Sequence, residues 1–161
     1  MDQTPNSPTE QNTIPQKIVI VEDNVEIAEI YETRLKMLGY TCFVANDGIA
    51  ALYLIQKEMP DLVLLDLMVP NVAGDEILKR MRTSKWGKDI PVFIISNLNE
   101  TDAPAGLREL NITGYVVKAN LSGDGLDRIV NSILRPTAED QQQIPPGETL
   151  TSSPQQTTPT Q

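Results

Sequence analysis

The sequence of 161 residues has no histidine, only one cysteine and no long run of apolar residues. Without histidine, the chain cannot form a phosphohistidine. Cys42 has no partner for an internal disulfide, and its place in the apolar stretch 41–44 is typical of a small buried residue. A membrane-spanning helix needs about 18 or more apolar residues in a row, and a secretion signal has a basic start before an apolar run. Because the sequence shows neither, we expect a cytoplasmic protein.

Basic and aromatic residues are missing from both ends of the chain. Residues 1–16 and 136–161 hold eight of the twelve prolines and no lysine or arginine, which predicts disordered tails. Residues 17–135 hold all 13 basic residues and enough apolar residues for one folded domain. That domain carries a net charge of −4 and the tails carry −5, whereas nucleic-acid binding needs a basic surface. We therefore expect protein partners, and neither a nucleic acid nor a membrane.

Short apolar runs alternate with helical patterns in the predicted domain. The runs typical of strands are 17–21, 41–45, 62–66, 91–96 and 114–118. Apolar residues at helical spacing predict helices at residues 24–39, 47–59, 74–84 and 126–134, the first with Asn24 as N-cap. A further helix is predicted at 101–110, where Pro104 and Gly106 indicate a short and mobile segment.

This alternation predicts a doubly wound α/β fold of the (βα)5 type with a five-stranded parallel sheet. We expect the flavodoxin-like strand order 2-1-3-4-5, in which the switch point lies between the first and third strands. In open sheets of this kind, ligands bind beyond the carboxyl ends of the strands at the switch point. The predicted fold therefore locates the site before any side chain is considered.

Acidic residues stand at both of the strand ends that form this switch point. Glu22 and Asp23 follow the first strand, and Asp66 ends the third. Two unit negative charges about 4 Å apart repel by about 4 kcal/mol at an effective dielectric constant of about 20, so three converging carboxylates need a cation. Considered alone, Glu22 and Asp23 are also consistent with stabilising the start of the next helix by about 0.3–1 kcal/mol.

Five separated positions make residues 16–135 resemble the receiver domain of two-component response regulators, here of a stand-alone type. Pro70 and Gly74 follow the third-strand acid at plus four and plus eight, as in that family. The five positions are the pair Glu22-Asp23, Asp66, Ser96 at the end of the fourth strand, and Tyr115 and Lys118 on the fifth.

The resemblance implies that Asp66 accepts a phosphoryl group. A carboxylate can act as a nucleophile toward phosphorus, and catalysis of this transfer consists mostly of positioning and charge neutralisation. By the same resemblance, Mg²⁺, with Mn²⁺ as an alternative, is held by Glu22, Asp23, Asp66 and the backbone carbonyl of Met68. Oxygen ligands of this kind suit a hard cation.

The resemblance also assigns roles to three residues on the fourth and fifth strands. Lys118 brings a point charge to the phosphoryl group, and Ser96 donates a hydrogen bond to it. Tyr115 is the aromatic switch whose ring turns inward as Ser96 moves toward the phosphate. Without the resemblance, the same residues are consistent with a solvated lysine, a turn-forming serine and a core tyrosine.

Two residues depart from the family pattern. Ala119 follows Lys118 where receivers usually have a proline preceded by a cis bond. A cis bond before a residue other than proline costs about 2.5–4 kcal/mol, so we expect a trans bond and a different loop. Asn97 follows Ser96 where many receivers have a small residue, so the lifetime of the phosphoryl group cannot be transferred from other members.

The sequence thus predicts a single-domain response regulator, a monomer or weak dimer. It would take a phosphoryl group from a histidine kinase or a histidine phosphotransfer protein and signal through the face formed by 101–110, 114–118 and the last helix. We expect no enzymatic activity beyond Mg²⁺-dependent self-phosphorylation and autodephosphorylation. Two alternatives remain: a phosphorylation-independent interaction module, and a flavodoxin-like enzyme that binds a small molecule or nucleotide, although no glycine-rich loop follows the first strand.

Overall fold

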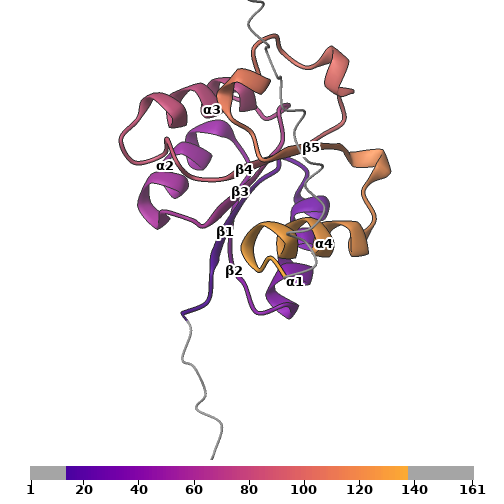
Figure 1. Cartoon of the computed structure of the whole chain (residues 1–161). Helices are drawn as coiled ribbons and strands as arrows, with labels where there is room; N and C mark the ends of the chain where they lie inside the picture. Colours follow the sequence, from indigo (N-terminus) through magenta and orange to yellow (C-terminus); the bar gives the residue numbers. More distant parts are fainter. Residues whose placement is uncertain (1–13, 138–161) are drawn as a thin grey trace, which may run out of the picture.

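The computed structural model describes residues 14–137, and Figure 1 shows them as one parallel sheet with helices on both faces. The strands are β1 (Lys17–Val21), β2 (Thr41–Ala45), β3 (Leu62–Leu65), β4 (Val92–Ser96) and β5 (Gly114–Val117). The α-helices of the described part are α1 (Val25–Met37), α2 (Gly48–Glu58), α3 (Gly74–Thr83) and α4 (Gly123–Leu134). All strand pairs are parallel in the order β2-β1-β3-β4-β5, so the predicted flavodoxin-like fold is confirmed.

The strands are apolar because both faces of the sheet are covered. Helices α2 and α3 lie on one face and α1 and α4 on the other (Figure 1). Every residue of β3 is buried, with side chains alternating between the two layers of the core. Cys42 on β2 is also buried, and burial raises the pKa of its thiol to about 11, so the prediction of a small buried residue is confirmed.

Local signals fix where the helices begin and end. The side-chain oxygen of Asn24 accepts a hydrogen bond from Ile27 N at 3.1 Å, which confirms the predicted N-cap of α1. After α1 the chain reverses at Gly39, whose φ of +88° is a left-handed conformation that glycine adopts without a steric cost. Asp47 caps α2 by accepting hydrogen bonds from Ile49 N and Ala50 N at 2.8 and 2.9 Å. No helix within residues 14–137 combines the length and apolar character needed to cross a membrane.

The prediction of a helix at 101–110 is wrong. Two separate 3₁₀ turns stand there, η1 (Glu100–Asp102) and η2 (Arg108–Leu110). Pro104 lacks the amide hydrogen that a continuing helix needs, and Gly106 has a φ of +82°, outside the helical range. Two 3₁₀ turns therefore replace the predicted helix, and the mobility expected for this segment stays a prediction.

Arg82 at the end of α3 holds this segment to the body of the domain. Its guanidinium donates to the carbonyl oxygens of Leu110 at 2.7 Å and Asn111 at 3.0 Å. It also donates to Gly87 O and Ile90 O in the loop before β4. Burial lowers the pKa of Arg82, and these carbonyl groups replace the water that the cation has lost.

The predicted tails fall mainly on residues 1–13 and 138–161, which lie outside the described residues. The described chain enters β1 through Gln16, whose side-chain amide donates to Leu134 O at 3.0 Å. At the other end, the guanidinium of Arg135 lies 4.2 Å from the ring centre of Tyr40. The two ends of the described chain therefore meet beside the start of β1, at the edge of the sheet away from the carboxyl ends of the strands.

The close approach of α3 to β3 explains Gly74 and gives a test. A Cβ atom at Gly74 would overlap the carbonyl oxygen of Asp66 and come within 2.6 Å of Leu67 Cα. We expect Gly74→Ala to lower the free energy of unfolding by about 1–3 kcal/mol, as overpacking does in dense interiors. Urea unfolding of the two proteins measures this difference.

Gly125→Ala is the matched control, because its Cβ would meet only side-chain atoms, the nearest being Ser122 Oγ at 3.1 Å. The control should leave stability unchanged or raise it by up to about 1 kcal/mol. Equal effects of the two substitutions would contradict the packing argument.

Candidate functional site

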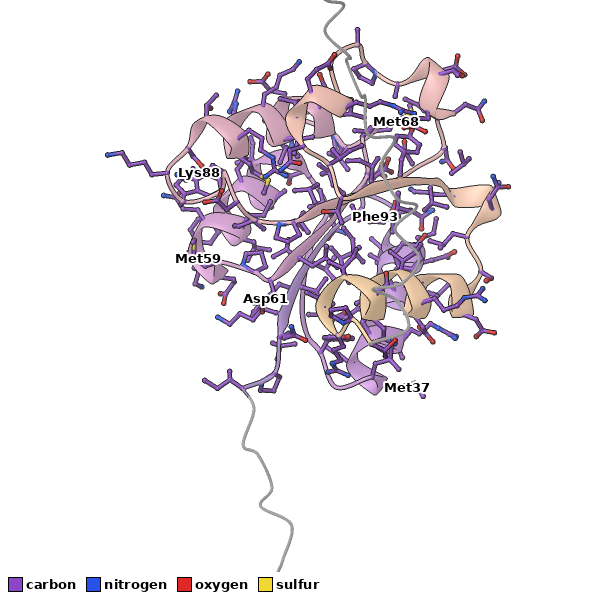
Figure 2. The ribbon with its side chains drawn as sticks, in the orientation of Figure 1. Met37, Met59, Asp61, Met68, Lys88 and Phe93 are labelled. Atoms are coloured by element: carbon purple, nitrogen blue, oxygen red, sulfur yellow. The ribbon has the colours of Figure 1, made fainter. Side chains whose placement is uncertain are left out.

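The three predicted acids converge at the carboxyl ends of β1 and β3. Val21 and Leu65 are register partners in neighbouring strands, so the residues that follow them leave the sheet side by side. Carboxylate oxygens of Glu22, Asp23 and Asp66 all lie within 4.8 Å of one another. Glu22 and Asp66 are 2% and 3% exposed, whereas Asp23 is exposed. Figure 2 shows that the labelled residues Asp61 and Met68, before and after β3, lie at opposite ends of that strand, which places the acids on the Met68 side.

Backbone amides hold two of the three carboxylates in place. Glu22 Oε1 accepts a hydrogen bond from Asn24 N at 3.1 Å, and Asp66 Oδ1 accepts one from Met68 N at 3.0 Å. Glu22 N itself donates to Ala45 O at 3.0 Å, so β2 fixes the backbone from which this side chain extends. The two buried acids are therefore oriented before any ligand binds.

Lys118 pairs with two of the three acids. Its ammonium nitrogen lies 2.6 Å from Glu22 Oε2 and 2.6 Å from Asp66 Oδ2, and the side chain is only 9% exposed. Burial alone would lower the pKa of Lys118, but its hydrogen bonds to Asp66 and Glu22 outweigh burial and raise it. Burial also raises the pKa of Glu22, against the opposing effect of Lys118. Lys118 therefore stays charged between two carboxylates that would otherwise repel each other.

The donor set fits a hard divalent cation. Three carboxylates offer oxygen atoms close enough to share one ion, and such ions prefer oxygen ligands. The exposed Asp23 leaves the cluster open on one side. Met68 lies beside Asp66 through its amide hydrogen bond, and its predicted role as a carbonyl ligand stays a prediction. The Met68 side chain is 57% exposed and lies at the edge of the site.

Ser96 and Tyr115 share one hydrogen-bonding partner, Leu98, which lies in the loop after β4. Ser96 is fully buried, and its hydroxyl accepts a hydrogen bond from Leu98 N at 3.4 Å. The Tyr115 hydroxyl donates to Leu98 O at 2.8 Å. Burial raises the pKa of Tyr115, while the Ser96 side chain acts in the opposite direction. Leu98 is thus hydrogen-bonded to both predicted switch residues.

The two departures from the family pattern lie at the edge of the site. No cis peptide bond occurs within residues 14–137, so the predicted trans bond before Ala119 is confirmed. The loop after Lys118 forms a 3₁₀ turn, η3 (Lys118–Asn120). Asn97 is exposed next to the buried Ser96, and its effect on the lifetime of a phosphoryl group remains a prediction.

Sequence reasoning missed two residues of the site. The Asn46 side-chain amide donates to Glu22 O at 2.9 Å. Tyr31 on α1 is half-buried and lines a narrow gap with Glu22 and Asp66, and burial followed by the Glu22 charge raises its pKa. Neither had a usable signal, because an asparagine before a helix cap is typical of a turn and a tyrosine at helical spacing is typical of a core.

Comparisons with known proteins agree with this geometry. The family model of the response regulator receiver domain matches residues 18–130. The ycf27 transcriptional regulator of Guillardia theta is 38% identical over 123 residues, which is 76% of this chain and 46% of the relative. The chain therefore spans about half the length of the curated relatives it matches.

Solved structures show the same fold. The receiver domain of the Francisella response regulator 1452 has a TM-score of 0.65 and 30% identity, covering 73% of this chain and 95% of that one. The receiver domain of the sensor histidine kinase PA1611 from Pseudomonas aeruginosa has a TM-score of 0.63 and 26% identity, covering 74% and 98%. That second structure carries a magnesium ion in its active-site cleft.

The charge balance at Lys118 predicts how stability depends on a cation. Lys118→Met leaves Glu22 and Asp66 buried without their partner, so we expect a loss of about 3–5 kcal/mol in unfolding free energy in the presence of a chelator. Added Mg²⁺ should restore more stability in this variant than in the wild type. Lys79→Met, which removes an exposed pair with Asp75, is the control and should cost no more than about 0.5 kcal/mol. Equal losses in both variants would show that Lys118 does not balance the acids.

The raised pKa of Glu22 predicts a pH effect of defined sign. Because its folded-state pKa lies above the ordinary value of 4.5, the stability that Glu22 contributes is present below pH 4.5 and is lost as the pH rises through the folded-state pKa. In chelator, Glu22→Gln should therefore gain stability relative to the wild type as the pH rises from below 4.5 to neutral. Urea unfolding at several pH values measures the difference, and a difference independent of pH would contradict the assignment.

Proposed function

Because the chain belongs to the family of response regulator receiver domains, we propose that it accepts a phosphoryl group on Asp66 from the phosphohistidine of a sensor histidine kinase or a histidine phosphotransfer protein. The surroundings of the Asp66 carboxylate carry the proposal. This carboxylate is 3% exposed, accepts hydrogen bonds from Lys118 Nζ and Met68 N, and lies beside two further acids. A nucleophile and its electrostatic support are thus assembled in one place.

In the proposed reaction, a carboxylate oxygen of Asp66 attacks the phosphorus atom. The new O–P bond forms as the P–N bond to the donor's imidazole breaks, and the electron pair of that bond leaves with the imidazole nitrogen. Lys118 provides a fixed positive charge near the phosphoryl oxygens. When bound by Glu22, Asp23, Asp66 and the carbonyl of Met68, Mg²⁺ or Mn²⁺ supplies further positive charge.

We further propose that Ser96 and Tyr115 transmit the modification. When the Ser96 hydroxyl turns to donate to a phosphoryl oxygen, it gives up its hydrogen bond from Leu98 N, which is long at 3.4 Å. Leu98 O is held by Tyr115, so the same movement loosens the segment that carries η1 and η2. The face formed by η1, η2, β5 and α4 then shifts between two states, and protein partners read the difference. The protein modifies itself and is reset by autodephosphorylation, so no enzymatic activity on another substrate is proposed.

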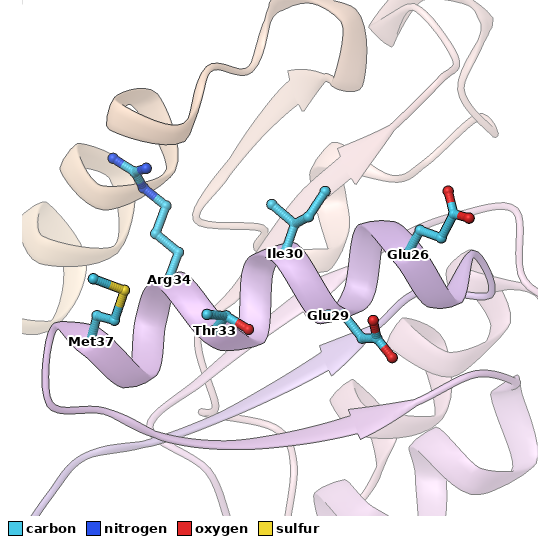
Figure 3. A pocket seen from close by; sticks show the side chains of 6 residues that line it. All are labelled: Glu26, Glu29, Ile30, Thr33, Arg34 and Met37. Carbon is cyan, nitrogen blue, oxygen red and sulfur yellow. The ribbon is translucent and has the colours of Figure 1, made fainter.

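Exposed apolar side chains beside the acids suit a protein as the phosphoryl donor. Val25 and Met68, each 57% exposed, flank the site. Along α1, Ile30 and Met37 are also exposed and line a surface hollow together with Glu26 and Glu29 (Figure 3). Exposed apolar residues rimmed by charges are typical of protein contact surfaces. The expectation that no nucleic acid binds rests on the net charge of the domain and remains a prediction, since the curated relatives are named as transcriptional regulators.

Phosphorylation by a small phosphodonor tests the proposal. With Mg²⁺ present, the wild type should form a hydroxylamine-labile adduct, which intact-mass spectrometry detects as one added phosphoryl group. Asp66→Asn should form none, whereas Asp75→Asn, which removes a partly exposed acid on α3, should react as the wild type does. An adduct that persists in Asp66→Asn would refute the acceptor role. The absence of an adduct in the wild type at any donor concentration would favour the phosphorylation-independent module.

A further inference from the structure

We propose that Asn46 is a positioning residue of the metal site, because its side-chain amide holds the peptide group that joins Glu22 to Asp23. The hydrogen bond from Asn46 Nδ2 to Glu22 O measures 2.9 Å. This inference rests on the metal binding in the proposed function, and it adds a residue outside the acidic cluster and the switch.

Asn46 adds one more hydrogen bond between β1 and β2 at the point where the two backbones separate. The register of β1 and β2 ends at the pair Val21 and Ala45, and Glu22 N still donates to Ala45 O at 3.0 Å. One residue later the β2 chain turns to start α2, where Asp47 becomes the N-cap. The side chain of Asn46 makes the next cross-strand hydrogen bond, to Glu22 O. The carbonyl that precedes the Asp23 amide is therefore satisfied by a side chain.

This bond matters most for Asp23. The Glu22 carboxylate is held by Asn24 N and Lys118, but within residues 14–137 the Asp23 carboxylate makes no hydrogen bond or ion pair. Only the backbone therefore sets the point from which this side chain extends. The peptide between Glu22 and Asp23 sets the position of the Asp23 Cα atom and the direction of its Cα–Cβ bond, and Asn46 holds that peptide through Glu22 O. Partners that orient metal ligands in this way typically affect metal affinity by about 10–100-fold.

The turn that carries Asn46 is itself held firmly. Gly48 N donates to Pro70 O at 3.0 Å, and a Cβ at Gly48 would overlap the carbonyl oxygen of Val72. The turn after β2 thus packs directly on the loop after β3. The backbone of Asn46 is therefore held in place by packing. Its side chain is exposed, and the hydrogen bond to Glu22 O is its principal contact with the site.

Calorimetric titration with Mg²⁺ and with Ca²⁺ tests the inference. Mg²⁺ requires near-octahedral ligand geometry, whereas Ca²⁺ accepts irregular geometry. We expect Asn46→Ala to weaken Mg²⁺ binding by about 10-fold or more and Ca²⁺ binding by less, so that the ratio of the two affinities falls. Asn99→Ala, which removes an exposed side chain that donates a hydrogen bond to Asp102, should leave both affinities unchanged.

Asn46→Asp separates orientation from charge and keeps the size of the side chain. It cannot donate to Glu22 O, yet it adds a negative charge that would by itself strengthen the binding of both cations. A fall in the ratio of Mg²⁺ to Ca²⁺ affinity in this variant and in Asn46→Ala supports the proposal. An unchanged ratio in either variant overturns it, including the case in which both affinities change by the same factor. If the wild type binds neither cation, the proposed metal site fails first, so the two failures are distinguishable.

Discussion

Two buried carboxylates share one cation, and the site depends on that balance. Lys118 Nζ lies 2.6 Å from both Glu22 and Asp66, and these acids are almost inaccessible to water. Removing Lys118 leaves two negative charges without a partner in a poorly solvated place, whereas removing one acid leaves Lys118 paired with the other. A phosphoryl group arriving at Asp66 changes the same balance, because it adds negative charge where Lys118 and a bound cation can offset it. The chemistry proposed for the site and the energetics of the resting protein are therefore consequences of one interaction.

The fold creates this balance through strand order. Because β1 lies between β2 and β3, Val21 and Leu65 at the ends of the first and third strands are neighbours although they are 44 residues apart in the chain. The apolar strands keep their acids at the very end of the sheet, where α1 and α3 begin. Gly74 lets α3 approach the backbone of Asp66, and Asn46 joins the end of β2 to the peptide between Glu22 and Asp23. Both contacts thus help to hold the backbone of the three acids in place.

The strands and the convergence of the acids could be predicted because they depend on patterns that are local or follow from strand order. Continuous apolar runs indicate parallel strands covered on both faces. An acid that ends such a run therefore lies beyond the carboxyl end of the sheet. The segment 101–110 could not be predicted in the same way, because Pro104 and Gly106 weaken a helix without specifying what replaces it. The structure places two 3₁₀ turns there, held by Arg82 from a distant helix. Asn46 escaped prediction for a related reason, since its role exists only where two strands separate in space.

The central claim is that the phosphoryl group resides on Asp66, and chemical trapping tests it most directly. Borohydride reduces an aspartyl phosphate to homoserine, which peptide mass spectrometry locates in the chain. After incubation with a phosphorylated histidine phosphotransfer protein and Mg²⁺, the account predicts homoserine at position 66 and at no other aspartate. Homoserine at Asp23 or elsewhere, or full transfer of the phosphoryl group with position 66 unmodified, would contradict it.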